Sequence, residues 1–166
     1  VSVWTAIAAE NLLEGDNVGV YMKAGFLYAG KKPLAANGTV IADAKKDEDV
    51  GVARLNGIID HKEGMLHVCK VPRILHGGSK KIRQDKLLDV IARTEITAAV
   101  GLEAFIALKA AGKKPDMFFG AREGVIEAAF HGIDCSIVIV DEEFTDFLKR
   151  LESVELAYVI HDLISP

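Results

Sequence analysis

The chain has 166 residues, a formal net charge of −4 and a hydrophobic content of 50%. This length fits one domain, or one domain with a small appendage, and can bury a core without disulfides or metals. The acidic balance argues against nucleic-acid binding by this segment itself, because such binding neutralises phosphates with Lys and Arg. The apolar runs are far shorter than the roughly 18 residues of a membrane span, so we expect no membrane partner.

The first part of the chain, residues 1–62, predicts a small β-rich, barrel-like unit. Residues 17–30 favour a hairpin with its turn at Lys23–Gly25, and residues 38–44 and 49–60 favour further strands. Glycines recur throughout this part, as is typical of a small twisted sheet or barrel.

The second part, residues 63–166, alternates strand and helix patterns at a short period. Alternation at this spacing needs crossover connections, so the strands should run parallel with helices on both faces. We therefore predict a doubly wound, mostly parallel five-stranded sheet, a Rossmann-like or flavodoxin-like α/β unit. The expected strands are residues 65–71, 95–100, 115–120, 135–141 and 156–161, and the expected helices are residues 84–94, 101–112, 121–132 and 142–153.

The two cysteines and the start of the chain bear on its cellular setting. Cys69 and Cys135 both lie in strand-like apolar segments, which favours buried free thiols in a reducing compartment. The chain begins at Val1 with no initiator Met and no secretory signal pattern. We expect a piece of a longer cytoplasmic protein.

The stretch RILHGGSKKIRQDKLLDVI, which follows the first α/β strand, carries the strongest local signal for a ligand. Ligands of open parallel sheets bind outside the carboxyl ends of the strands. Gly77 and Gly78 would let the backbone approach a ligand, Ser79 offers a hydroxyl, and the helix start that follows offers free N–H groups. The basic residues here reverse the local sign of an acidic chain: Arg73, His76, Lys80, Lys81 and Arg83. Neither GxxxxGK[ST] nor GxGxxG is present, so a glycine corner with a solvated basic patch is the alternative to an anion site.

The loops after the later strands supply further candidates. Gly101 allows close approach, and Gly120 forms a turn before Arg122, whose charge is unfavourable at a helix N-terminus unless Glu123, a loop or an anion holds it. Capping of the following helix is the favoured role of Asp141 over ligand binding. The full candidate ligand-binding set is Arg73, His76, Gly77, Gly78, Ser79, Lys80, Gly101, Gly120, Arg122 and Asp141.

Catalytic, metal and cofactor patterns are weak. The five histidines are scattered without metal-ligand spacing to Cys, Asp or Glu, and the sequence indicates no cofactor. Ser79 as a nucleophile needs an adjacent base, and the proximity of His76 in sequence guarantees no geometry. We assign no catalytic residue on this basis.

Nearly the whole chain resembles the C-terminal region of a family of archaeal winged helix-turn-helix transcriptional regulators that is itself uncharacterised. The resemblance rests on VSVWTAIAAENLLEGDNVGVYMKAGFLYAG, GTVIADAKKDEDVGVARLNGIID, VPRILHGGSKKI and AAVGLEAFIALKAAGKKPDMFFGAREGVIEAAFHGIDCSIVIVD. It implies that DNA is bound only through an N-terminal domain missing from this chain.

Two functions remain open at this point. The favoured one is a ligand-sensing or dimerisation domain of a transcriptional regulator, which binds a small anionic metabolite at the carboxyl ends of the parallel strands and forms a homodimer. The alternative is an enzyme acting on a small phosphorylated or carboxylated substrate. Its acid or base would come from His76, Glu103, Glu123 or Asp141.

Overall fold

The computed structural model describes residues 2–165, and the chain divides into two compact units, Val1–Lys62 and Glu63–Pro166. Each unit has its own hydrophobic core, because the buried clusters contain residues of one unit only.

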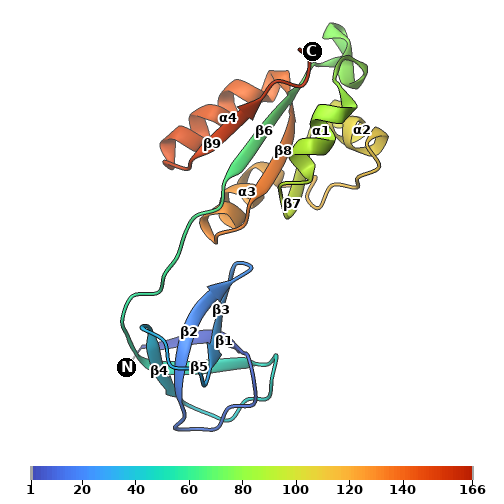
Figure 1. Cartoon of the computed structure of the whole chain (residues 1–166). Helices are drawn as coiled ribbons and strands as arrows, with labels where there is room; N and C mark the ends of the chain where they lie inside the picture. Colours follow the sequence, from blue (N-terminus) through green and yellow to red (C-terminus); the bar gives the residue numbers. More distant parts are fainter. Residues whose placement is uncertain (1, 166) are drawn as a thin grey trace. The chain divides into compact units, whose positions relative to one another are not determined.

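The first unit is a closed five-stranded barrel with the strand order β1-β3-β2-β4-β5 (Figure 1). Strand β1 closes it by pairing with β3 in parallel and with β5 in antiparallel. The predicted hairpin is confirmed, since β2 and β3 pair in register from Gly19–Gly30 to Lys23–Phe26. The strands are β1 (Val3–Ala8), β2 (Asn17–Lys23), β3 (Phe26–Gly30), β4 (Asn37–Val40) and β5 (Asp49–Asn56).

The barrel interior is filled by small side chains. Its buried cluster consists of Ala and Val residues apart from Leu12, and neighbouring strands approach so closely that even Cβ atoms are excluded in places. A Cβ added at Gly38 would lie 2.5 Å from Val52 Cγ1 and 2.9 Å from the Ala53 carbonyl oxygen. Closure of so narrow a barrel therefore depends on residues with little volume.

The second unit is a four-stranded sheet with the order β7-β8-β6-β9, in which every pairing is parallel. Its strands are β6 (Leu66–Val71), β7 (Ile96–Val100), β8 (Cys135–Val140) and β9 (Tyr158–His161). The helical elements are the short 3₁₀ turns η1 (Ile74–His76) and η2 (Gly78–Lys81) and the helices α1 (Gln84–Ile91), α2 (Leu102–Ala110), α3 (Ala121–Phe130) and α4 (Asp141–Ser153).

The prediction of a five-stranded doubly wound sheet is wrong, because residues 115–120 form no strand. Only Met117 pairs here, through a single parallel bridge to Ala98. Pro115 cannot donate to a ladder, and the Asp116 carboxylate accepts the Thr97 backbone N–H at 2.8 Å. Gly120 then turns into the left-handed region at the start of α3. A segment expected to form a strand is thus a short loop against β7.

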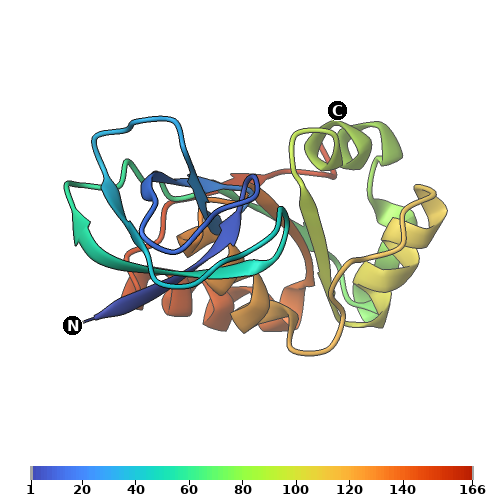
Figure 2. The same cartoon turned by 90° about the horizontal axis from the view of Figure 1, so that it is seen from below.

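The sheet lies between two helical layers, as Figures 1 and 2 show. Helices α3 and α4 cover one face, where Phe147, Leu151 and Val125 pack against Ile137. Helices α1 and α2 cover the other face. All six residues of β8 are buried, as expected for a strand in the middle of a parallel sheet.

Both cysteines are free and buried, on the neighbouring strands β6 and β8. Burial raises the pKa of each thiol, Cys69 and Cys135, to about 12, so both stay protonated. Among the helices of residues 2–165, none is long and apolar enough to cross a bilayer.

Candidate functional site

The carboxyl ends of β6 and β8 form the natural crevice of this sheet. These two strands are neighbours, but the chain leaves β6 through α1 toward β7 on one face and leaves β8 through α4 toward β9 on the other. The connections therefore diverge between adjacent strands. Open α/β sheets bind ligands at such a switch point.

Charged side chains from both connections meet at this switch point. The Arg73 guanidinium donates from Nε to Asp141 Oδ1 at 2.8 Å, and His76 Nδ1 lies 3.2 Å from Asp141 Oδ2. Arg73 follows β6, and Asp141 follows β8 directly. Asp141 is 68 positions from Arg73 and 65 positions from His76 in the sequence, yet the three predicted residues contact one another. We call these three residues the rim cluster.

The rim cluster holds Asp141 in its charged form. Partial burial of the carboxylate opposes ionisation, but hydrogen bonds from Arg73 and His76 outweigh burial and lower the pKa of Asp141. The side chain of Asp141 is 18% exposed, whereas that of His76 is 60% exposed and remains accessible from solvent. The helix-capping role expected for Asp141 is wrong, because Asp141 is the first residue of α4 and makes no side-chain cap bond.

The third connection reaches the same rim through Glu103. This side chain, in the first turn of α2, accepts the Ile74 backbone N–H with Oε2 at 2.9 Å. Gly101 makes the approach of α2 feasible, since its φ is 92° and a Cβ there would lie 2.7 Å from Val140 Cγ1. The sequence offers Glu103 as an acceptor in the first turn of this helix and as a candidate acid or base, but that its partner is the Ile74 backbone has no signal in the sequence.

The glycine turn differs from the expected cradle. Gly77 ends η1 with a backbone in the left-handed region, and a Cβ added at this position would clash with the Lys81 side chain. Gly78 is buried at the start of η2. Helix α1 begins only at Gln84. The glycines therefore do not present the N-terminus of a long helix to a ligand.

A pocket of about 400 Å³ lies beside the loop that follows β6, and its lining includes Ile74, the chain neighbour of Arg73, but none of the three residues of the rim cluster. It is lined by Ile74, Ser79, Lys80, Leu102, Glu103 and Ile106, so Ser79 and Lys80 of the predicted set lie beside aliphatic walls. The volume lies within the range of small-molecule sites in proteins, roughly 300–1,000 Å³. We call this cavity the rim pocket.

Two remaining candidates lie on the helical layer of α3 and α4. Gly120 turns the chain into α3, and Arg122 donates to Glu143 at 2.6 Å. Glu123 pairs with Arg150 at 2.7 Å. The charge of Arg122 is thus held by a neighbouring helix, which needs no ligand.

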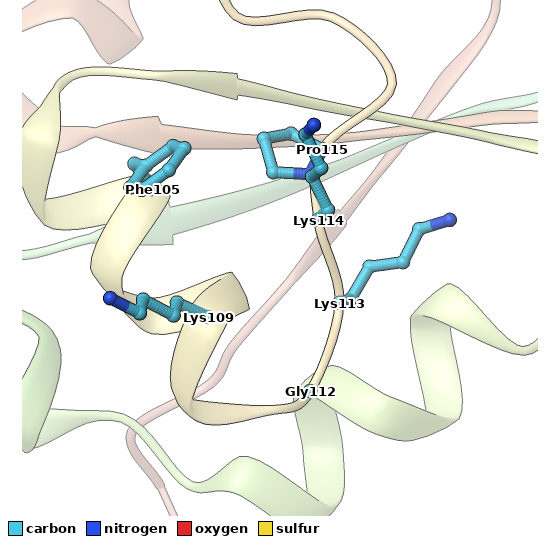
Figure 3. Close-up of a pocket in the computed structure, with 6 residues that line it drawn as sticks. All are labelled: Phe105, Lys109, Gly112, Lys113, Lys114 and Pro115. Atoms are coloured by element: carbon cyan, nitrogen blue, oxygen red, sulfur yellow. The ribbon is translucent and has the colours of Figure 1, made fainter.

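A second pocket, of about 390 Å³, lies at the carboxyl end of α2 and was not anticipated. Its lining includes Phe105 of α2 and Pro115 of the loop that follows, and the side chains of Lys109 and Lys113 extend in opposite directions (Figure 3). The cations do not converge on one point. The signal that could have found this pocket is the run Lys113-Lys114-Pro115 after a helix-ending glycine.

The fold and the rim together define a parallel α/β domain with a charged switch-point crevice. Residues 60–160 match the family described as "Domain of unknown function (DUF7839)", and because this match spans more than half of the chain, the chain belongs to that family. It is also 29% identical over 163 residues to "Uncharacterized protein MJ0558" of Methanocaldococcus jannaschii. That alignment covers 96% of this chain but 62% of the relative's length. No solved structure matches the chain.

Proposed function

We propose that the α/β unit is the ligand-sensing domain of a cytoplasmic transcriptional regulator, and that it binds a small anionic metabolite at the rim pocket. The observation that carries this proposal is the meeting of Arg73, His76 and Asp141 at the switch point. DNA would be bound by a part of the regulator outside this chain. The relative's greater length leaves room for such a part.

The chemistry of the rim pocket supports a ligand with one anionic group and an apolar body. Lys80 lines the rim pocket and offers an ammonium group. Arg73 does not line the pocket, but it directly precedes Ile74, which does, and its described side-chain bond uses only Nε. Its two terminal nitrogens can therefore donate to the carboxylate or phosphate of a ligand that extends past Ile74. Ile74, Leu102 and Ile106 supply the aliphatic walls. Asp141 and Glu103 limit the net positive charge, which favours a ligand with a single anionic group over a polyphosphate.

The test is a thermal-shift screen of the chain against nucleotides, sugar phosphates, amino acids and carboxylic acids. A true ligand should raise the midpoint by about 2–6 °C at saturating concentration. Lys80→Ala should abolish this shift, and the control Lys114→Ala, in the second pocket, should leave it intact. A hit that survives Lys80→Ala would overturn the assignment of the rim pocket.

The same samples test the proposed homodimer. Exposed aliphatic side chains cluster at this rim, with Ile74 74%, Leu75 87% and Leu102 66% exposed, and apolar patches of this kind mark interaction sites. Sedimentation velocity with and without the hit compound should reveal a dimer whose population depends on the ligand. A monomer under both conditions would remove the dimerisation part of the proposal.

One observation favours the enzyme as a second candidate. Asp141 orients the His76 imidazole, an arrangement that suits a general base. A hit compound that the wild-type chain converts to product, and that His76→Gln binds without conversion, would favour an enzyme. Binding without any turnover would favour the sensor.

A further inference from the structure

The edge of the sheet carries two histidines that the rim does not use. Strand β9 lies at one end of the strand order and pairs only with β6, with His67 opposite Val159 and Cys69 opposite His161. Side chains two residues apart on a strand share a face. His67 and His161 therefore project from the same face of two adjacent strands.

The two imidazoles meet nitrogen to nitrogen. His67 Nδ1 lies 2.8 Å from His161 Nε2, the ring centroids are 5.0 Å apart, and the ring planes differ by 28°. Both side chains are half-buried, so the pair is reachable from solvent. Two ring nitrogens are thus directed at the same small volume between the strands.

The surroundings of both rings disfavour their charged form. The pKa of His67 is lowered by burial and by the charge of Arg93, with Asp134 acting in the opposite direction. The pKa of His161 is lowered by burial, by His67 and by Arg93. Neutral imidazole is the commonest protein ligand for transition metals.

We propose that His67 and His161 form a binding site for one Zn²⁺-class transition-metal ion at the β6–β9 edge. Zn–N bonds of about 2.0–2.1 Å at a tetrahedral angle place two ligand nitrogens about 3.3 Å apart. The observed separation of 2.8 Å must widen by about half an ångström, and each ring must turn by roughly 35° so that its lone pair leaves the partner nitrogen and points at the shared ion. Rotations about χ1 and χ2 of the two half-buried side chains supply both changes. The ring proton that lies between the two nitrogens moves to the outer nitrogen of its own ring, so both inner nitrogens present lone pairs.

The pair would provide two of the metal's ligands. Among residues 2–165, no group of three or more His, Cys, Asp or Glu side chains could hold a metal ion, so water completes the coordination. Arg93 opposes a dication at this position and Asp134 favours it, by the same charges that act on the His67 pKa. The bound ion would join strands whose histidines lie 94 residues apart in sequence, and would fasten the edge strand β9 to the sheet.

The test is isothermal titration of the whole chain with ZnCl₂ at pH 7.5, with MgCl₂ as the comparator. We expect one Zn²⁺ per chain and no heat from Mg²⁺, which prefers oxygen ligands. His67→Ala and His161→Ala should each weaken Zn²⁺ binding at least about tenfold, whereas His131→Ala, at the end of α3, should leave it unchanged. Unchanged binding in both pair variants, or no binding by the wild type, would overturn the site.

If the histidine variants misfold, a variant that is expected to bind Zn²⁺ more tightly still tests the site. Arg93 is exposed, so Arg93→Gln should preserve the fold while removing the opposing charge. Zn²⁺ binding should then tighten about two- to tenfold at low ionic strength. Affinity that does not respond to Arg93→Gln would place the metal elsewhere. None of these readouts depends on the rim pocket or its ligand.

Discussion

The two units of this chain fill their interiors in opposite ways. The barrel is packed with Ala and Val, and it brings strands so close that Gly38 has no room for a Cβ. The α/β unit instead fits Phe147, Leu151, Leu87 and Leu108 between a sheet and its helices. Both interiors are close-packed, so the stability of both units depends on side-chain volume. An added methyl group should destabilise the barrel, whereas the loss of a large side chain should destabilise the α/β unit.

The units also carry separate spectroscopic reporters, which makes this comparison measurable. Trp4, the single tryptophan, lies in β1 of the barrel. The four α-helices of residues 2–165 all lie in the second unit. Tryptophan fluorescence during denaturant unfolding therefore follows the barrel, and circular dichroism at 222 nm follows the α/β unit.

The largest effect is expected from Phe147→Ala. Phe147 is 1% exposed within the cluster between the sheet and its helices, and removing a buried ring leaves a cavity that costs about 3–5 kcal/mol. The dichroism midpoint should fall sharply while the fluorescence midpoint stays in place. Phe119→Ala is the matched control, since Phe119 is 91% exposed and its loss should cost under about 0.5 kcal/mol. Equal shifts in both signals would show that the two units unfold as one.

Gly38→Ala should produce the reverse pattern at smaller size. The added methyl group meets Val52 and the Ala53 carbonyl, and overpacking of this kind costs about 1–3 kcal/mol. Here the fluorescence midpoint should fall and the dichroism midpoint should not. Leu13→Ala, at a barrel position that is 60% exposed, serves as the control. A fully stable Gly38→Ala barrel would show that β4 and β5 can separate without loss.

The fold was predictable where the chain repeats a strong period. Four expected helices and the strand patterns of β6, β7 and β8 follow from apolar runs and spacing, and each is present. Residues 115–120 misled because Met117 and two phenylalanines favour a strand, while the competing bond from Thr97 N–H to Asp116 is invisible in sequence. Local strand propensity cannot reveal that a side-chain carboxylate accepts the backbone N–H that a neighbouring strand would otherwise use.

The sequence predicts which loops meet at the candidate site, but not which side chains bind one another there. The rule that ligands of parallel sheets bind at the carboxyl ends of the strands places Arg73, His76 and Asp141 at one rim from the sequence alone. It could not show that Asp141 would bind those two residues in preference to capping α4, nor that Arg122 would pair with Glu143. The His67–His161 pair was missed entirely, because its register depends on which strand lies beside β6.

The smallest effect is expected at the rim cluster, from Asp141→Asn. Asparagine keeps the shape but loses the charge that pairs with Arg73, which should cost about 1 kcal/mol at pH 7 because the pair is partly exposed. The pKa of Asp141 is lowered in the folded state, so its contribution is complete above the unfolded value of about 3.9. The contribution is lost as pH falls through the lower folded pKa.

The difference between wild type and Asp141→Asn, followed by dichroism, should therefore shrink between about pH 5 and pH 2. Asp146→Asn, at an exposed position on the same helix, should show no comparable difference at pH 7. A gap that persists below pH 2 would mean that the charge of Asp141 contributes nothing to holding the loops after β6 and β8 together. In that case Asp141 would stabilise the rim cluster through packing and hydrogen bonds that do not depend on its charge, and the cluster would keep this stabilisation in acid.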